Sequence, residues 1–194
     1  MIRVSYPRLG LLVGKALLEI LSQEAYQVTY RKLIREFQTQ TPTSERMYFQ
    51  QGRSKVDDSF PSISLEIKQR QDAFAATDYT KELTFRFDIT VAVKALSAIK
   101  ATSTGETNQV EQYIITLAEF VLEVLNEPLA ALQYTVTTDQ EGAALAVPFK
   151  IYDSLADTID YGHLYNGALR IAKISWQGKI LRLGPAGTPL QPGY

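Results

Sequence analysis

The sequence predicts an α+β fold in which a mostly antiparallel β-sheet packs against one or two helices, with a long β-hairpin arm and an N-terminal helical segment. Two patterns predict it. Apolar residues recur at helical spacing in 9–37 and in 109–126. Between and after these segments, apolar and polar residues alternate, as in strands with one face against a core. The 45% hydrophobic and 21% charged residues are ordinary for a globular protein.

The N-terminal part is expected to be helical. Apolar residues lie at i, i+3 and i+4 spacing from Leu9 to Leu21, and a second set runs from Ala25 to Phe37. Thr41–Ser44 ends the pattern. Ser22–Glu24 is either a break between two helices or the middle of one long helix, and the pattern leaves both open. The polar stretch 41–61 is then expected to form a long loop, and such loops usually have a binding or packing role.

The firmest strand is predicted from Lys81 to Leu96, where apolar residues occupy every second position from Leu83 to Val93. At about 3.3 Å per residue it would span about 50 Å, so we expect it to extend beyond the core as part of an arm. A shorter strand is predicted at Ile63–Ile67, followed by a polar connection at Gln69–Thr80. These two strands account for the first half of the sheet.

A helix is predicted from Gln109 to Asn126, with Thr107 or Asn108 as its N-cap and Pro128 ending it. We expect it to cover the apolar face of the sheet. Further strands are predicted at 132–136 and 147–151.

In the last strand the alternation changes phase: Leu169 and Ile171 share one parity, and Ile174 and Trp176 share the other. This slip at Ala172–Lys173 predicts a β-bulge or a bend. Gln177–Lys179 is predicted as a turn that leads into 180–183.

The length fits one domain at 1–183, composed of a helical part at 1–40, the long loop at 41–61, and the sheet with its helix at 62–183. The Gly/Pro-rich segment 184–194 is predicted to be a flexible tail.

Composition excludes several classes of site. The chain has no Cys, so disulfides and thiolate metal sites are excluded. Met1–Arg8 lacks the features of a signal peptide, and the apolar stretch Leu9–Leu21 is too short to span a bilayer. A soluble protein without membrane contact is therefore expected.

Charge is distributed unevenly along the chain. Its net value of −1 combines +5 over Met1–Val56 with −6 over Asp57–Tyr194. Such polarity can steer copies of a subunit head-to-tail or hold a partner of opposite sign, although two solvated surfaces are an equally simple interpretation.

The usual catalytic and nucleotide-binding motifs do not occur. Asp153, Asp157 and Asp160 precede the single histidine, His163, but no recognisable nucleophile accompanies them. A solvated loop between strands and a structural histidine are the expected interpretations. The sequence thus predicts no catalytic residue, no cofactor and no metal site.

Two groups of charged residues are candidates for interfaces. Arg46, Arg53 and Lys55 lie in the long loop. Glu119, Glu123 and Glu127 recur at i+4 spacing along the predicted helix and form either an acidic stripe that meets a basic surface or a solvated face. With a pI near 5.9 and no recognition motif, sequence-specific DNA binding is not expected.

The order of elements, with Phe85–Val93, Gln112–Leu122 and Tyr161–Trp176, resembles the tail terminator and neck proteins of long-tailed bacteriophages. The resemblance covers about 62–176 by pattern of elements. It implies a structural virion protein of the tail or neck, assembled in the host cytoplasm as a homo-oligomeric ring, with a hexamer expected. Such a ring caps the tail tube and joins it to the head connector, and it has no catalytic residue to transfer.

The resemblance also implies the partners. They are the tail tube, the sheath protein where there is one, the head connector or adaptor, and double-stranded DNA that passes through the lumen without being read. Arg46, Arg53 and Lys55 are then expected to face the channel or an adjoining ring. The alternatives are another head–tail connector or head-completion protein, a non-viral adaptor domain, or an enzyme that uses Asp153, Asp157, Asp160 and His163.

Overall fold

The computed structural model describes residues 6–37, 45–52, 59–74, 81–94, 106–127, 135–138, 141–164 and 169–182. Its elements are α1 (Tyr6–Leu21), α2 (Glu24–Phe37), β1 (Tyr48–Gln51), β2 (Ser62–Phe74), β3 (Lys81–Lys94), α3 (Glu106–Asn126), β4 (Thr135–Thr138), β5 (Ala144–Leu164) and β6 (Leu169–Arg182). The strands form one six-stranded sheet in the order β1-β2-β3-β6-β5-β4. Only β1 and β2 are parallel. The predicted α+β class, with a mostly antiparallel sheet against helices, is confirmed.

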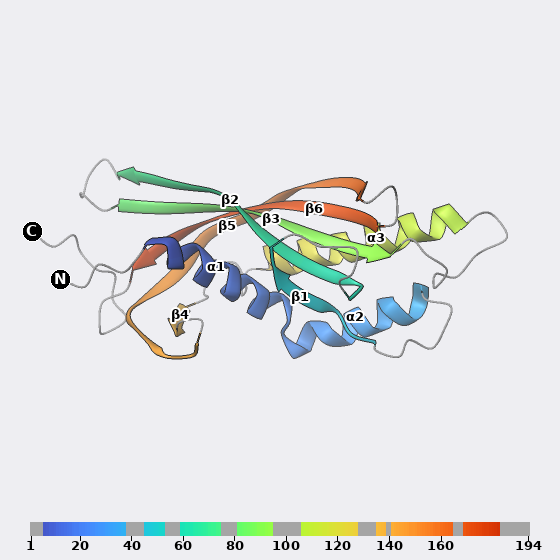
Figure 1. Ribbon diagram of the computed structural model, residues 1–194, viewed down its shortest axis with the longest axis horizontal. Coiled ribbons are helices and arrows are strands. Elements are labelled where there is room, and N and C mark those ends of the chain that lie inside the picture. Colours follow the sequence, from blue (N-terminus) through green and yellow to red (C-terminus); the bar gives the residue numbers. More distant parts are fainter. Residues whose placement is uncertain are drawn as a thin grey trace, which may run out of the picture.

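The helices cover one face of the sheet, and α1 lies between β1–β2 and the curled end of β5 with β4 (Figure 1). α3 packs on β6, β5 and β3, and α2 packs on α3. Two long hairpins, β2–β3 and β5–β6, have their turns at opposite ends of the sheet (Figure 1). None of the described helices is long and apolar enough to cross a membrane.

The N-terminal half differs from the sequence prediction at several boundaries. Ser22 and Gln23 separate two helices, which settles the alternative left open. The predicted loop 41–61 contains β1, because its apolar residues add a short parallel strand to β2. The predicted connection from Gln69 is wrong up to Phe74, since β2 continues to that residue along β3. α3 begins at Glu106, so the proposed caps, Thr107 and Asn108, lie inside the helix.

The inward face of β3 is buried by the chain itself over its described length. Every second residue from Leu83 (3% exposed) to Val93 (1% exposed) belongs to the core. α1 covers the Phe85 end, and α3 covers the remainder. The β2–β3 hairpin is long, as predicted, but the expectation that β3 extends beyond its core is wrong from Leu83 to Val93, because two helices cover it instead of one.

Two glycines let α1 approach this face closely. The Cβ of an alanine at position 10 would lie 2.6 Å from Ile67 Cδ1, and one at position 14 would lie 3.3 Å from Phe87 Cε1. The Gly10/Gly14 spacing therefore has a packing role in this fold. Their lack of side chains allows the helix backbone to approach the aromatic rings of β3.

The phase change in β6 has a different cause from the predicted bulge. β6 pairs with β3 without interruption through Ala172 and Lys173, and it continues to Arg182 without a turn at Gln177–Lys179. The parity changes because both faces of the sheet are buried at this end. Ala92, Leu169 and Ile171 form a second cluster with Phe60 on the face away from the main core.

The irregularities of the ladder lie in β5 and β2. β5 contains one register shift between Tyr152 and Leu155 and another between Ala156 and Thr158. Asp153, in the first, has a left-handed backbone with φ of 48° and forms an ion pair with Lys179 at 2.9 Å. The predicted solvated loop around Asp153–Asp160 is therefore wrong, because these residues belong to a bulged strand.

Gly178 leaves room for the side chain of Trp176, the largest of β6, to lie over it on the same strand. An alanine Cβ at this position would lie 2.4 Å from Trp176 Cη2 and 3.3 Å from Ser154 Cβ. The indole of Trp176 is buried and packs edge-to-face with Phe87 at 5.8 Å between ring centroids. The space above Gly178 thus holds part of the central core.

Gly178→Ala is expected to lower the free energy of unfolding by about 1–3 kcal/mol, because the buried indole must leave its position. Urea denaturation measures the effect. Gly162→Ala is the matched control in the neighbouring strand, because the nearest atom to its Cβ, Ile171 Cγ1, is 3.8 Å away. Equal stability of the two variants would contradict this account of the core.

Candidate functional site

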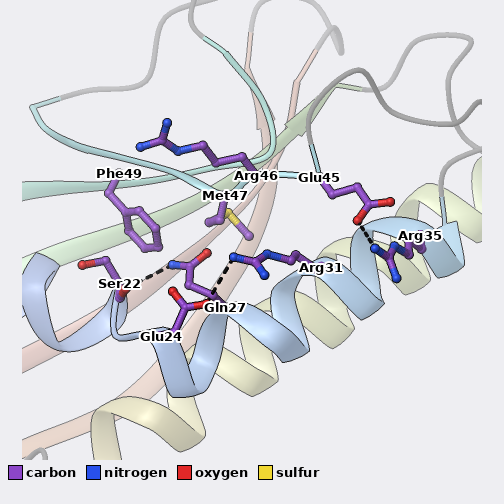
Figure 2. A pocket seen from close by; sticks show the side chains of 9 residues that line it. All are labelled: Ser22, Glu24, Gln27, Arg31, Arg35, Glu45, Arg46, Met47 and Phe49. Carbon is purple, nitrogen blue, oxygen red and sulfur yellow. Dashed lines mark hydrogen bonds and ion pairs between the residues drawn. The ribbon is translucent and has the colours of Figure 1, made fainter.

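A cleft of about 640 Å³ lies between α2 and the segment that leads into β1 (Figure 2). It is lined by Ser22, Glu24, Gln27, Arg31, Arg35, Glu45, Arg46, Met47 and Phe49. Helical spacing brings Arg31 and Arg35 to the same side of α2, and the chain entering β1 brings Arg46 opposite them. Only Arg46 among these cations belongs to the three predicted from the sequence; Arg53 and Lys55 lie outside the described residues.

The cations of the cleft are neutralised to different degrees. Arg35 forms an ion pair with Glu45, which raises the pKa of Arg35 and holds that of Glu45 below its usual value. Arg31 Nη2 lies 3.3 Å from Glu24 Oε1. Among the residues that the structure describes, Arg46 has no ion-pair partner, and its guanidinium is directed away from α2 (Figure 2). Arg46 is therefore the cation most available to a partner.

The positive charge continues onto the outer side of α2. A shallower hollow of about 310 Å³ is lined by Val28, Arg31, Lys32 and Arg35. Val28 lies among these cations and is 64% exposed. We refer to Arg31, Lys32, Arg35 and Arg46, with Val28, as the basic surface.

The predicted acidic stripe on α3 separates into two parts. The side chains of Glu119, Glu123 and Glu127 are all exposed. Glu127 accepts a hydrogen bond from the Tyr26 hydroxyl and so belongs to the contact between α2 and α3. Glu119 and Glu123 form no ion pair within the described part of the chain. These two residues, with Ile115 one turn before Glu119, are called the acidic stripe below.

α2 separates the basic surface from the acidic stripe. Its inner side packs on α3 through edge-to-face contacts of Phe120 with Tyr26 and Tyr30, and through stacking of Phe37 on Tyr113. Its cations face the β1 side instead, where they share the cleft with Phe49. On the other flank, α3 packs on β5, where burial and then the charge of Glu119 raise the pKa of Tyr161. The two charged surfaces of one subunit thus face different directions.

The four residues of the enzyme alternative do not converge. Asp157 lines a hollow on the open face of the sheet with Lys68, Arg86 and Asp88. His163 lines a separate cleft with Glu111, Tyr161 and Arg170. No group of three or more acidic or histidine side chains with metal-binding geometry occurs among the described residues.

The interface residues predicted from the sequence do not include the cations of α2. Arg31, Lys32 and Arg35 contribute to that prediction only through the net charge of Met1–Val56. Their signal was present, since the i, i+4 spacing of Arg31 and Arg35 places them on one helical face, beside the face of the buried Tyr30 and Ile34. The sequence does not show that Arg46 lies across the cleft from the cations of α2.

Comparison with known proteins gives little to transfer. No protein-family model matches the chain, and no curated protein matches it. Among solved structures, one similar chain comes from the virion of a native gene transfer agent (GTA) particle. It has a TM-score of 0.47 and 10% sequence identity, with 91% of this chain and 98% of that chain covered. A similarity this weak carries no argument about function.

The Tyr26–Glu127 contact predicts sensitivity to alkali. Burial, then the hydrogen bond to Glu127 and its charge, raise the pKa of Tyr26 to about 12. In the unfolded chain the group titrates near 10, so between about pH 10 and 12 the unfolded state releases a proton that the folded state retains. The free energy of unfolding is therefore expected to fall as the pH rises through this range.

Denaturant unfolding at several pH values measures this dependence. Tyr26→Phe retains the ring that packs on Phe120 and removes the titrating hydroxyl, so its loss of stability above pH 10 is expected to be shallower. Glu127→Gln serves as a second variant, because it retains an acceptor and removes the charge. An unchanged pH dependence in Tyr26→Phe would contradict the assignment.

Proposed function

We propose that the chain is a structural subunit of a phage-like virion and acts as a tail terminator: a ring that caps the tail tube and joins it to the head connector. The observation that carries the proposal is the pair of oppositely charged surfaces, the basic surface and the acidic stripe, which α2 separates on one subunit. A head-to-tail ring requires two different, complementary surfaces on each subunit. The element order from β2 to β6, which resembles the phage tail terminators, supports the same function.

The remaining details follow from this function. The ring is proposed to be a hexamer of the virion neck, contacting the tail tube, the sheath protein where there is one, and the head connector, with double-stranded DNA passing through its lumen unread. Arg46 is proposed to face the lumen or an adjoining subunit. The chain is proposed to have no enzymatic activity, and the separation of Asp157 from His163 supports this.

Native mass spectrometry and negative-stain electron microscopy of the purified protein test the ring, which should appear as a closed oligomer with one stoichiometry. Particles assembled without the protein should have tails of irregular length, because nothing stops polymerisation of the tube. A strict monomer that is absent from virions would exclude the proposal. Uniform tails that fail to join heads would favour a head-completion protein instead.

A further inference from the structure

We propose that the acidic stripe of one copy docks against the basic surface of the next copy, with Arg46 paired to Glu123. The inference rests on the proposed function only in that both require self-association. It adds which two surfaces meet and in which direction, from the acidic stripe of one copy to the basic surface of the next. It also adds which residues align the two surfaces.

The charge balance of each surface favours this pairing. Arg46 has no partner among the described residues, and neither Glu119 nor Glu123 forms an ion pair there. All three side chains are exposed, so each is accessible to a charged group on another copy. The association leaves Arg35–Glu45 and Arg31–Glu24 intact, because it uses the cation that these carboxylates do not neutralise.

The apolar residues of the two surfaces also match. Val28 lies beside Arg31 and Lys32 on α2, and Ile115 lies four residues, about 6 Å along the helix axis, before Glu119 on α3. Each surface therefore has one exposed apolar side chain on a helix (Val28 64% exposed, Ile115 36%), beside mainly cationic groups on α2 and acidic groups on α3. Packing of α2 against α3 of the next copy would bury both apolar side chains and bring the opposite charges together.

The pairing of these two surfaces requires two copies, because the fold prevents it within one subunit. The contacts of Tyr26, Tyr30 and Phe37 hold the inner side of α2 on α3, so its basic side faces away from the acidic stripe of the same chain. Double-stranded DNA is the alternative occupant of the basic surface, and the DNA-binding measurement below distinguishes it from a second copy.

Cross-linking between introduced cysteines tests which surfaces meet, and the cysteine-free chain makes it specific. The full chain carrying Val28→Cys and Ile115→Cys, which leaves Arg46 and Glu123 in place, is treated with a short bismaleimide. Direct oxidation is unsuitable because a disulfide requires Cα atoms within about 7 Å. We expect a ladder of covalent oligomers from the double variant and none from either single variant. Lys173→Cys with Ile115→Cys is the matched control, since Lys173 is exposed on β6.

The outcomes separate this inference from the proposed function. Closed rings in the microscope with no cross-linking above the control would overturn the docking inference and leave the tail terminator intact. A product that stops at the covalent dimer would support the pairing of the surfaces but overturn the ring. In a two-fold dimer the acidic stripe of each copy meets the basic surface of the other, so no surface is left to continue a ring.

Charge reversal supplies an independent measurement. Arg46→Glu and Glu123→Arg are each expected to weaken self-association roughly tenfold at low salt, because each places like charges in contact. Combining them should restore most of the loss, whereas Arg46→Glu with Lys173→Glu should not. Sedimentation velocity at low and high salt measures the effect. Arg46→Glu that abolishes binding to a double-stranded DNA probe but leaves self-association unchanged would overturn the inference.

Discussion

The structure depends on the burial of the inward face of β3. This strand lies at the centre of the sheet between β2 and β6. Its apolar residues from Leu83 to Val93 belong to the core between the sheet and the helices. α1 covers one part of this face because Gly10 and Gly14 allow its backbone to approach the rings, and α3 covers the rest. Because α2 packs on α3, the positions of the cations of α2 and of the acidic stripe follow from this central contact.

The edges of the sheet are less regular than its centre, for an identifiable reason. Within the described residues, β5 pairs with β4 only near its start, so most of its length has a neighbour on one side only. Its register shifts interrupt the row of backbone groups that another chain could pair with. Asn126, at the end of α3, donates to Ala156 O at 2.7 Å and accepts from Ala156 N at 3.0 Å, so this side chain satisfies backbone groups between the two shifts. Side-chain surfaces on the helices, rather than open strand edges, are thus the better adapted for contact between copies.

Predictions from the sequence succeeded where one local pattern decides the structure. The alternation in β3 and the helical repeat of α3 come from neighbouring residues along one element, and both elements were identified with small errors at their ends. They failed where two elements decide together. The parity change at Ala172 was attributed to a bulge because the sequence does not reveal that Phe60 covers the opposite face. The excess length of β3 was assigned to an arm beyond the core because nothing local shows that α1 covers it.

The sequence by itself determined the α+β class, the central strand, the covering helix and an excess of cations near the N-terminus, because composition and periodicity are properties of one segment. Tertiary structure alone decided which charges are available. It paired Arg35 with Glu45, used Glu127 to bind Tyr26, and left Arg46, Glu119 and Glu123 exposed on two sides of α2. Ion pairs depend on distances between residues that are remote in the chain, and only the packing of α2 between β1 and α3 sets those distances.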